Sequence, residues 1–333
     1  MLSRLETGLQ SLGIDFVNNA EVSSTLLKSR AQLVVYPNTE QASTLHRLLN
    51  DHQQTFHVHG GGSNTLLMGT ELDPMKTVVI DSRKMNGIHL NIGTAQICAG
   101  GGTKISAVSR ESASGNLTGL EFARDIPGST AGAVVTDAWH PIHNYTKIFE
   151  AFGITDTELP ESIRQVLSWV EVVDENGDVV RMDTSQLEMH DRQSVFSQPD
   201  NTKIVLNVMF QLAEGDPEKI AKARTVINLG RQEMRKKNKE KNPWSVGATL
   251  GYTFVLNHPG YNGISATQLI GMTGRLPETI MIGGMVHAKS TANIIGNTGS
   301  GSAEGYLRVA DLIQEVVLKE HNIELPLEVR VVR

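Results

Sequence analysis

The stretches Gly60-Gly61-Gly62-Ser63-Asn64 and Ile126-Pro127-Gly128-Ser129-Thr130-Ala131-Gly132-Ala133 are the most informative parts of this chain of 333 residues. Glycine has no Cβ, so a glycine-rich loop lets backbone N–H groups approach a phosphate closely. In the second stretch we expect Pro127 to begin a short helix, whose N-terminal N–H groups and dipole favour an anion. Together the two stretches predict a site for a phosphate-bearing ligand.

The first stretch ends a predicted βαβ unit. Residues 33–36 and 56–59 have the composition of strands, and residues 42–49 between them have apolar positions on one helical face. Asn38 and Gln41 resemble a capping box before that helix. Thr65 occupies the third glycine position of G-x-G-x-x-G, and no Gly-Lys-Ser/Thr follows. The loop therefore matches neither common phosphate-binding motif, and a simple tight turn is the alternative.

The rest of the chain predicts an α+β protein. Short apolar runs broken by Gly, Asn and Asp predict hairpins at residues 78–80, 95–99, 170–173 and 204–212. Helices are expected at 217–237 and 305–320, and an alternating pattern predicts a closing strand at 324–332. We expect domain segments at 1–77, 78–213, 214–322 and 323–333.

Composition restricts the class of protein. A hydrophobic fraction of 39% and a charged fraction of 20% are those of a folded globular chain. The net charge of -6 disfavours nucleic acid as the main partner, since that binding depends on Lys and Arg. There is no apolar run of membrane-spanning length and no signal peptide, and Cys98 is the only cysteine. We therefore expect a cytoplasmic protein that binds small molecules and has no disulfide.

The two glycine stretches resemble those of the UDP-N-acetylenolpyruvoylglucosamine reductase (UDP-N-acetylmuramate dehydrogenase, MurB-like) family. That family has a G-G-G-S-N loop after its first βαβ unit and an I-P-G-S/T-x-G-G-A segment further on, from which only Ala131 departs. Other family segments are matched in order along nearly the whole chain. They are Asp191-Arg192-Gln193-Ser194-Val195-Phe196, Gly251-Tyr252-Thr253-Phe254, Ala266 through Gly274, Gly283-Gly284-Met285, Ala292 through Asn297, and Leu325 through Arg330.

The resemblance implies an FAD-binding fold of the vanillyl-alcohol-oxidase/PCMH type with a C-terminal reductase-like substrate domain. It also implies that NADPH reduces FAD, which then delivers hydride to an enolpyruvyl double bond. By position, Arg192 and Glu328 would stabilise the developing charge, and Tyr252 occupies the place of the family's proton-donating serine. Noncovalent FAD binding is implied for Gly60, Gly61, Gly62, Ser63, Asn64, Gly119, Ile126, Pro127, Gly128, Ser129, Thr130, Gly132 and Ala133.

The departures from the family lie mostly on the substrate side. Tyr252 is larger than the serine that it replaces, and the family's asparagine-rich stretch after the second loop is changed. We expect the altered pocket to be lined by Trp139, His140, His143, Thr253 and Asn293. The leading expectation is therefore an FAD-dependent oxidoreductase with a non-standard small or sugar-nucleotide-like substrate. The alternatives are the standard NADPH-dependent reduction and a non-catalytic flavin-binding protein, against which the retained Arg192 and Glu328 argue.

Three other features have simpler explanations. His140 and His143 could suggest a metal pair, but no third ligand has suitable spacing, so we expect no metal. His57 and His59 share one strand face and are expected to be structural. The basic run at residues 235–241 is expected to be a solvated helix end, with substrate-phosphate binding as the alternative.

Overall fold

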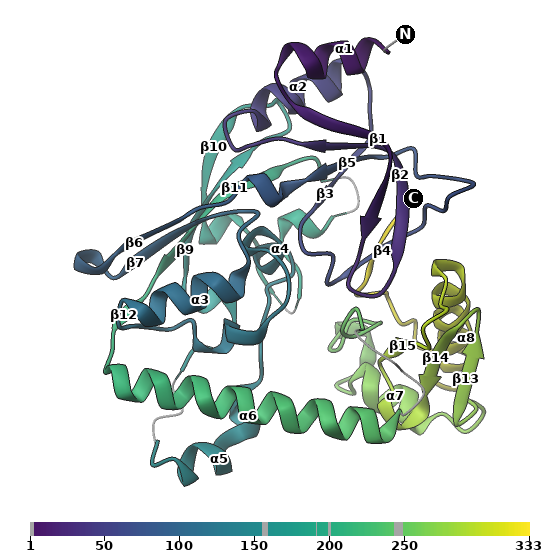
Figure 1. The fold of residues 1–333 in the computed structure, drawn as a ribbon. Coiled ribbons are helices and arrows are strands. Elements are labelled where there is room, and N and C mark those ends of the chain that lie inside the picture. The colour runs from purple at the N-terminus through teal and green to yellow at the C-terminus, as the bar shows by residue number, and fades with distance from the viewer. Residues whose placement is uncertain (1–2, 155–158, 191, 199–200, 243–248) are drawn as a thin grey trace. The chain divides into compact units, whose positions relative to one another are not determined.

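The computed structural model describes residues 3–154, 159–190, 192–198, 201–242 and 249–333 (Figure 1). It divides into two compact units. Unit 1 comprises Met1–Asn18, Leu33–Gly61 and Thr77–Gln232, and unit 2 comprises Asn19–Gln32, Gly62–Lys76 and Glu233–Arg333. The first glycine stretch is thus shared between the units. The four segments expected from the sequence stay a prediction.

The predicted βαβ unit is present at the start of the chain. Strands β2 (Lys28–Tyr36) and β3 (Phe56–His59) flank helix α2 (Ala42–Asp51) in sequence. In the sheet, β5 (Val78–Asp81) lies between them and is parallel to both, and β1 (Asp15–Ser23) completes the order β1-β2-β5-β3. Helix α1 (Arg4–Ser11) contributes Leu5 and Leu9 to the core beneath this sheet.

The expected capping box forms a turn before α2 rather than the cap itself. The Asn38 N–H donates to Gln41 Oε1 at 3.0 Å, and the Gln41 N–H donates to Asn38 Oδ1 at 2.9 Å. The helix begins one residue later, so Gln41 is the N-cap and its side chain makes no capping bond. The reciprocal pattern was predicted correctly, but the helix begins three residues later than a capping box at Asn38 would place it.

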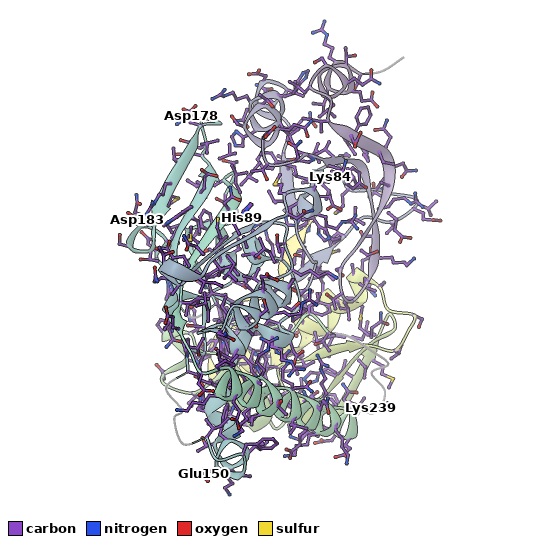
Figure 2. All side chains as sticks on the ribbon, turned by 60° about the vertical axis from the view of Figure 1, so that its left-hand side comes forward. Lys84, His89, Glu150, Asp178, Asp183 and Lys239 are labelled. Carbon is purple, nitrogen blue, oxygen red and sulfur yellow. The ribbon has the colours of Figure 1, made fainter. Side chains whose placement is uncertain are left out.

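The second sheet of unit 1 is antiparallel, in the order β10-β9-β11-β7-β6. The bounds are β6 (Ile88–Asn91), β7 (Gln96–Gly100), β9 (Leu167–Val173), β10 (Val179–Asp183) and β11 (Ile204–Gln211). Two of the four expected runs lie in hairpins, β6–β7 and β9–β10. The run at 78–80 is instead in the parallel strand β5, and the run at 204–212 forms β11, which pairs with β7 and β9 rather than with its neighbour in sequence. Strand β10 is at the edge, and Asp178 and Asp183 mark its two ends (Figure 2). Charged residues at an edge strand hinder pairing with other chains.

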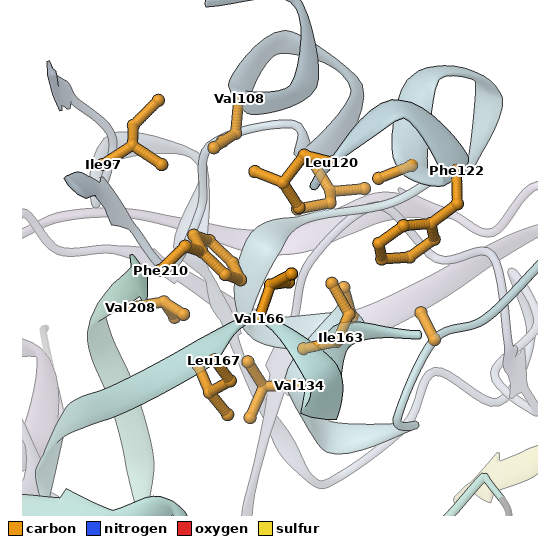
Figure 3. Close-up of a cluster of buried hydrophobic side chains, with 14 of the residues drawn as sticks. Ile97, Val108, Leu120, Phe122, Val134, Ile163, Val166, Leu167, Val208 and Phe210 are labelled. Carbon is orange, nitrogen blue, oxygen red and sulfur yellow. The ribbon is translucent and has the colours of Figure 1, made fainter. Parts of the chain in front are cut away.

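Helices α3 (Ile105–Ser114) and α4 (Thr130–Val135) contribute to the same hydrophobic core as this sheet, and α5 (Thr146–Ala151) follows α4 in the chain. The short strands β8 (Leu117–Thr118) and β12 (Ala213–Glu214) pair nearby. Figure 3 shows Val108 and Val134 gathered with Phe210 and Ile97 from the strands. This core supports the segment that begins at the second glycine stretch.

Helix α6 (Pro217–Lys241) is longer than the predicted 217–237. Its first part buries Ile220, Val226 and Ile227, whereas residues 235–241 are almost entirely exposed. Lys237 pairs with Glu233 one helical turn earlier, at 2.8 Å. This environment agrees with a solvated helix end. Phosphate binding by this run stays a prediction.

Unit 2 has a small antiparallel sheet of β13 (Thr279–Ile282), β14 (Met285–Ala288) and β15 (Ile295–Asn297). Helices α7 (Ala266–Met272) and α8 (Ala303–His321) share its core, and α8 confirms the predicted final helix. Strand β4 (Thr65–Leu67) follows the first glycine stretch directly and pairs in parallel with β16 (Arg330–Val332).

The predicted closing strand at 324–332 is wrong in its extent. Only Arg330–Val332 forms a strand, because the segment changes partners between residues 328 and 330. Leu327 forms an isolated antiparallel bridge with Phe254, whereas Arg330 pairs with Thr65. Pro326 has no N–H for a continuous ladder. Within the described residues, no helix is long and apolar enough to span a membrane.

Candidate active site

In unit 1, the two glycine stretches are in direct contact. A Cβ on Gly61 would lie 2.5 Å from Cα of Gly128, and a Cβ on Gly60 would overlap Ser129 Oγ. Gly128 also has φ of +105°, which side chains other than glycine rarely allow. Only glycine fits at these positions, because the two backbones approach within van der Waals contact. Gly60 and Gly61 of the first stretch therefore lie directly against Gly128 and Ser129 of the second, and cofactor binding by them stays a prediction.

The helix after the second stretch differs from expectation. Ser129, not Pro127, is the N-cap of α4, and its Oγ accepts from the Gly132 N–H at 3.2 Å. The Thr130 N–H donates to Thr103 O at 2.7 Å, and the Ala131 N–H donates to Gly101 O at 2.9 Å. These helix-start N–H groups are bonded within the protein. These N–H groups are therefore not available to an anion in this structure.

A third glycine run, Gly100-Gly101-Gly102, lies against the second stretch. Our sequence reasoning missed it, although three consecutive glycines after a predicted strand were a visible signal. A Cβ on Gly100 would lie 2.6 Å from Met85 O, and a Cβ on Gly101 would lie 3.2 Å from Cβ of Ala131. The missing Cβ of Gly101 leaves room for the Ala131 methyl group, which explains how alanine replaces the family glycine there.

Several residues expected to bind the cofactor are buried or hydrogen-bonded within the protein. Thr130 is completely buried, and its hydroxyl donates to Thr103 O at 2.8 Å. Ala133 is buried, and Ile126 packs on the hydrophobic core. The Gly119 N–H donates to the buried carboxylate of Glu121 at 2.7 Å. That N–H is therefore bonded within the protein, and cofactor binding by Gly119 stays a prediction.

The remainder of the first stretch belongs to unit 2, where it is bonded to the segment that carries Glu328. The Asn64 Nδ2 donates to Glu328 O at 3.2 Å, and the Arg330 N–H donates to Asn64 O at 3.1 Å. The Thr25 N–H donates to Gly62 O at 2.8 Å. Asn64 Oδ1 is buried and has no hydrogen-bond partner among the residues described. It is a polar atom suited to a ligand, and the half-buried Ser63 lies next to it in the loop.

Tyr252 and Glu328, far apart in sequence, lie on two segments that pair in unit 2. The Phe254–Leu327 bridge is antiparallel, and the Glu328 N–H donates to Thr253 O at 2.9 Å. Thr253 is therefore directly opposite Glu328. The resemblance assigned both segments to the site, and the structure brings them together.

Arg192 belongs to unit 1, where it occupies a tight turn between His190 and Gln193. Those two residues exchange backbone hydrogen bonds of 3.1 and 2.7 Å, and Arg192 has φ of +70°. The hydroxyl groups of Ser194 and Ser197 donate to Val135 O at 2.9 and 2.6 Å. The turn is thus attached to the C-terminal end of α4. Asp191, part of the matched segment, lies outside the described residues.

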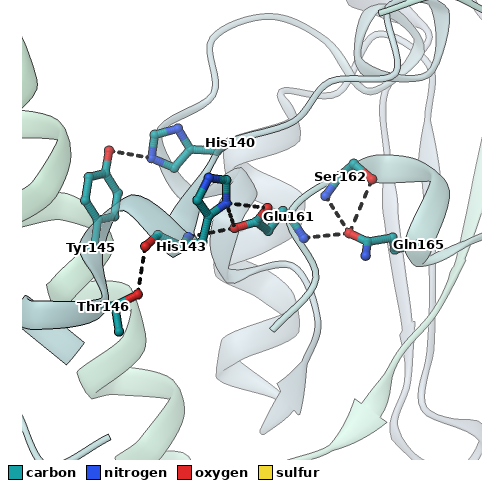
Figure 4. A network of polar contacts seen from close by, with 7 residues as sticks. All are labelled: His140, His143, Tyr145, Thr146, Glu161, Ser162 and Gln165. Atoms are coloured by element: carbon teal, nitrogen blue, oxygen red, sulfur yellow. Dashed lines mark hydrogen bonds and ion pairs between the residues drawn. The ribbon is translucent and has the colours of Figure 1, made fainter. Parts of the chain in front are cut away.

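The histidines after the second stretch have separate environments (Figure 4). His140 is buried, and its Nε2 lies 3.0 Å from the Tyr145 hydroxyl. His143 is exposed, with its Nδ1 2.8 Å from Glu161 Oε1. Trp139 is half-buried and bridges to Ser162. Substrate contacts by these residues stay a prediction, with His140 the least accessible of them.

Burial lowers the pKa of His140 to about 3, and the positive charge of Arg231 acts in the same direction. The unfolded chain binds a proton at this histidine below about pH 6.5, whereas the folded chain does not until pH 3. Stability should therefore fall as pH decreases through that interval, by about 2 kcal/mol at pH 5 from this group. Chemical denaturation at pH 7 and pH 5 should show a smaller loss for His140→Gln than for wild type. Equal losses would contradict the prediction.

Thr253 and Asn293, expected to bind substrate, are hydrogen-bonded within the fold, and substrate contacts by them stay a prediction. Both are completely buried. The Asn293 amide accepts from the Phe254 N–H and donates to Phe254 O, each at 2.8 Å. The Thr253 hydroxyl accepts from the Tyr306 hydroxyl at 3.1 Å. We assign both residues to holding the Tyr252 segment in place.

His57 and His59 are buried on β3, with ring centroids 6.1 Å apart, which agrees with the structural expectation. No group of three or more candidate metal ligands occurs in the part of the chain that the structure describes.

The close approach of Gly60 and Gly61 to the second stretch at Gly128 and Ser129, with no Cβ between the backbones, fits a phosphate-bearing cofactor. Residues 31–147 match the family described as FAD binding domain. The protein is an FAD-dependent oxidoreductase, with an α+β fold whose FAD-binding part is of the vanillyl-alcohol-oxidase type.

Similarity extends along most of the chain. Residues 193–332 match the UDP-N-acetylenolpyruvoylglucosamine reductase C-terminal domain. The UDP-N-acetylenolpyruvoylglucosamine reductase of Clostridium beijerinckii is 30% identical, over 90% of this chain and 86% of the relative. The enzyme of that name from Clostridium novyi is 29% identical, over 91% and 86%. The crystal structure of the Thermus caldophilus reductase has a TM-score of 0.66 and 21% identity, covering 96% of this chain and 99% of that one. The chain belongs to the UDP-N-acetylenolpyruvoylglucosamine reductase family.

Proposed function

We propose that this chain catalyses the NADPH-dependent reduction of UDP-N-acetylglucosamine enolpyruvate, the reaction expected from the names of its relatives. The observation that carries the proposal is the pairing of the Glu328 segment with the Tyr252–Thr253 segment. That pairing keeps the carboxylate beside the segment that holds the family's proton donor. A small sugar-nucleotide substrate and a cytoplasmic location are part of the proposal.

The cofactor arrangement follows from the glycine stretches. We propose that backbone groups around Gly60, Gly61 and Gly128 bind the FAD pyrophosphate, since no Cβ hinders its approach. In unit 1, Pro127, Ser129 and Gly132 complete the second stretch. In unit 2, Gly62, Ser63 and Asn64 complete the first stretch, and the buried Asn64 Oδ1 is an acceptor that suits a hydroxyl or N–H group of the cofactor. When bound, FAD takes up hydride from NADPH and supplies it to the enolpyruvyl double bond.

Arg192 and Glu328 act on the substrate in this proposal. The Arg192 guanidinium offers a planar pair of donors to the substrate carboxylate, whose charge grows as hydride is added. Glu328 shares a proton with the developing enolate oxygen. The net reaction consumes one proton, which must reach the carbon that does not receive hydride, while the proton shared with the enolate oxygen returns to Glu328. Tyr252 stands in the position of the residue that supplies the proton to carbon. A phenolic hydroxyl can donate a proton.

A non-standard substrate, the leading expectation from the sequence, remains the second candidate. Tyr252 favours it, because a tyrosine at the position of a serine changes the size of the pocket and the place of the hydroxyl. Thr291, in place of the family histidine, is a further departure. The relatives at 29% and 30% identity nonetheless span nearly the whole chain, and we therefore prefer the standard reaction.

The test is NADPH oxidation by the FAD-loaded protein, followed by absorbance. We expect consumption of NADPH that depends on UDP-N-acetylglucosamine enolpyruvate, with Tyr252→Ser retaining the reaction because serine is the family residue. A protein that holds FAD but leaves NADPH unchanged when this substrate is added would contradict the proposal and favour the second candidate. Tyr252→Ser would then damage the natural reaction without creating the standard one.

A further inference from the structure

Two buried hydroxyl groups, those of Thr253 and Tyr306, lie beside the segment that carries Glu328. Neither residue is among the expected catalytic residues. Thr253 was expected only to bind substrate, and Tyr306 was not singled out from the sequence. We propose that Thr253 and Tyr306 are positioning residues that hold the Glu328 carboxylate in place for its reaction. The inference rests on the proposed function, in which Glu328 shares a proton with the substrate.

Backbone pairing fixes Thr253 relative to Glu328. The Glu328 N–H donates to Thr253 O at 2.9 Å, and the Val255 N–H donates to Pro326 O at 3.0 Å. These bonds flank the Phe254–Leu327 bridge, so Thr253 and Glu328 are directly opposite each other. Side chains at directly opposed positions of an antiparallel pair lie on the same side. The side chains of Thr253 and Glu328 should therefore lie on the same face of the two paired segments.

Tyr306 lies in the first turn of α8, and its hydroxyl contacts Thr253. The Tyr306 hydroxyl donates to Thr253 Oγ1 at 3.1 Å, and its side chain is almost completely buried. Ser302 caps α8 by accepting from the Gly305 N–H at 3.0 Å. A Cβ on Gly305 would lie 2.7 Å from Gly283 O, so the helix start is packed tightly against the turn before β14. Tyr306 is thus held by a rigid helix end.

The pKa of Tyr306 depends on burial, on the hydrogen bond with Thr253 and on the charge of Glu328. Burial is the main cause that raises the pKa of Tyr306, the bond with Thr253 opposes the rise, and the charge of Glu328 contributes to it. The phenol therefore stays protonated and can act as a donor at neutral pH. It donates to Thr253, which leaves the Thr253 hydroxyl proton available for an acceptor on the Glu328 side.

Tyr261 is a natural control in the same core of unit 2. It is as deeply buried as Tyr306, and its hydroxyl donates to Val255 O at 3.1 Å. Burial alone raises the pKa of Tyr261 to about 12, with no contribution from Glu328. A variant that lacks this hydroxyl loses one buried hydrogen bond, as Tyr306→Phe does, but leaves the surroundings of Glu328 intact.

The experiment separates the two half-reactions by stopped-flow absorbance of the flavin. We expect Tyr306→Phe and Thr253→Val to be reduced by NADPH at the wild-type rate. Their reoxidation by UDP-N-acetylglucosamine enolpyruvate should be slower by about 10- to 100-fold, the scale for a misplaced reacting group. Thr253→Ser keeps a hydroxyl and should restore most of the rate. Tyr261→Phe should behave as wild type in both steps, and thermal melting should confirm that all variants fold.

Coupling to Glu328 gives a second readout. In a Glu328→Gln background, Tyr306→Phe should add little further loss, because residues that act through one group are not additive. Three outcomes would overturn this inference but leave the proposed function standing. They are additive losses in the double variant, unchanged reoxidation in Tyr306→Phe and Thr253→Val, and equal slowing by Tyr261→Phe. Wild-type protein that this substrate fails to reoxidise would overturn the proposed function and the inference together.

Discussion

Gly61→Val should purify with little or no FAD. The valine Cβ would lie 2.5 Å from Cα of Gly128, and its two methyl groups need further space. The backbones of the two glycine stretches must then separate, which moves the groups that bind the pyrophosphate. Overpacking of this kind costs about 1–3 kcal/mol, so FAD affinity should fall about 10-fold or more. The flavin-to-protein absorbance ratio of the purified variant measures the effect.

Gly93→Val is the matched control. Gly93 also lies in unit 1, but a Cβ there would meet only Asn91 Oδ1, at an ordinary 3.6 Å. This variant should keep wild-type flavin content. Cooperative thermal unfolding of both variants would separate a local effect on the loops from loss of the fold. If Gly61→Val retained FAD at wild-type stoichiometry, the two stretches would not form the pyrophosphate site.

The elements that the sequence predicted best have local signals. Strand β3 and the Gly60–Gly61 turn were predicted from a short apolar run and the glycines themselves. Helix α8 was predicted from apolar spacing along one face. In each case the interactions that define the element lie within a few residues along the chain, where composition and period reveal them.

The errors occurred where distant segments meet. Residues 324–332 alternate as one strand should, but the partner changes from Phe254 to Thr65, and periodicity contains no information about partners. For Thr253 and Asn293, polar side chains typical of a binding site predicted substrate contacts, which stay a prediction. Their hydrogen-bond partners, Tyr306 and Phe254, became visible only in the folded chain.

The helix-start N–H groups illustrate the same limit. The sequence of the second stretch predicts a helix N-terminus, and helix α4 indeed follows it. Two of those N–H groups donate hydrogen bonds to Thr103 O and Gly101 O, which precede the stretch by more than twenty residues. Whether the groups face a ligand therefore depends on residues outside the motif. A motif therefore locates a binding loop more reliably than it identifies the atoms that bind.

The Glu328 segment is held by two parts of unit 2. Thr253 O accepts from the Glu328 N–H, and Asn64 Nδ2 donates to the Glu328 carbonyl. Asn64 belongs to the first glycine stretch, so the loop proposed to bind FAD is bonded directly to the residue proposed to act on substrate. Such preorganisation is what an acid or base needs in order to act at a fixed position.

Glu328→Gln should therefore lower turnover by about 100-fold or more while FAD remains bound, the scale for losing one positioned acid or base. Glutamine keeps the size and the backbone contacts of the glutamate but cannot share its proton, so reduction of the flavin by NADPH should be unaffected. Glu324→Gln, an exposed position in the same segment, is the matched control and should retain wild-type turnover. Steady-state NADPH oxidation with UDP-N-acetylglucosamine enolpyruvate measures both variants. Normal turnover by Glu328→Gln would mean that Glu328 has only a structural role at the end of this segment.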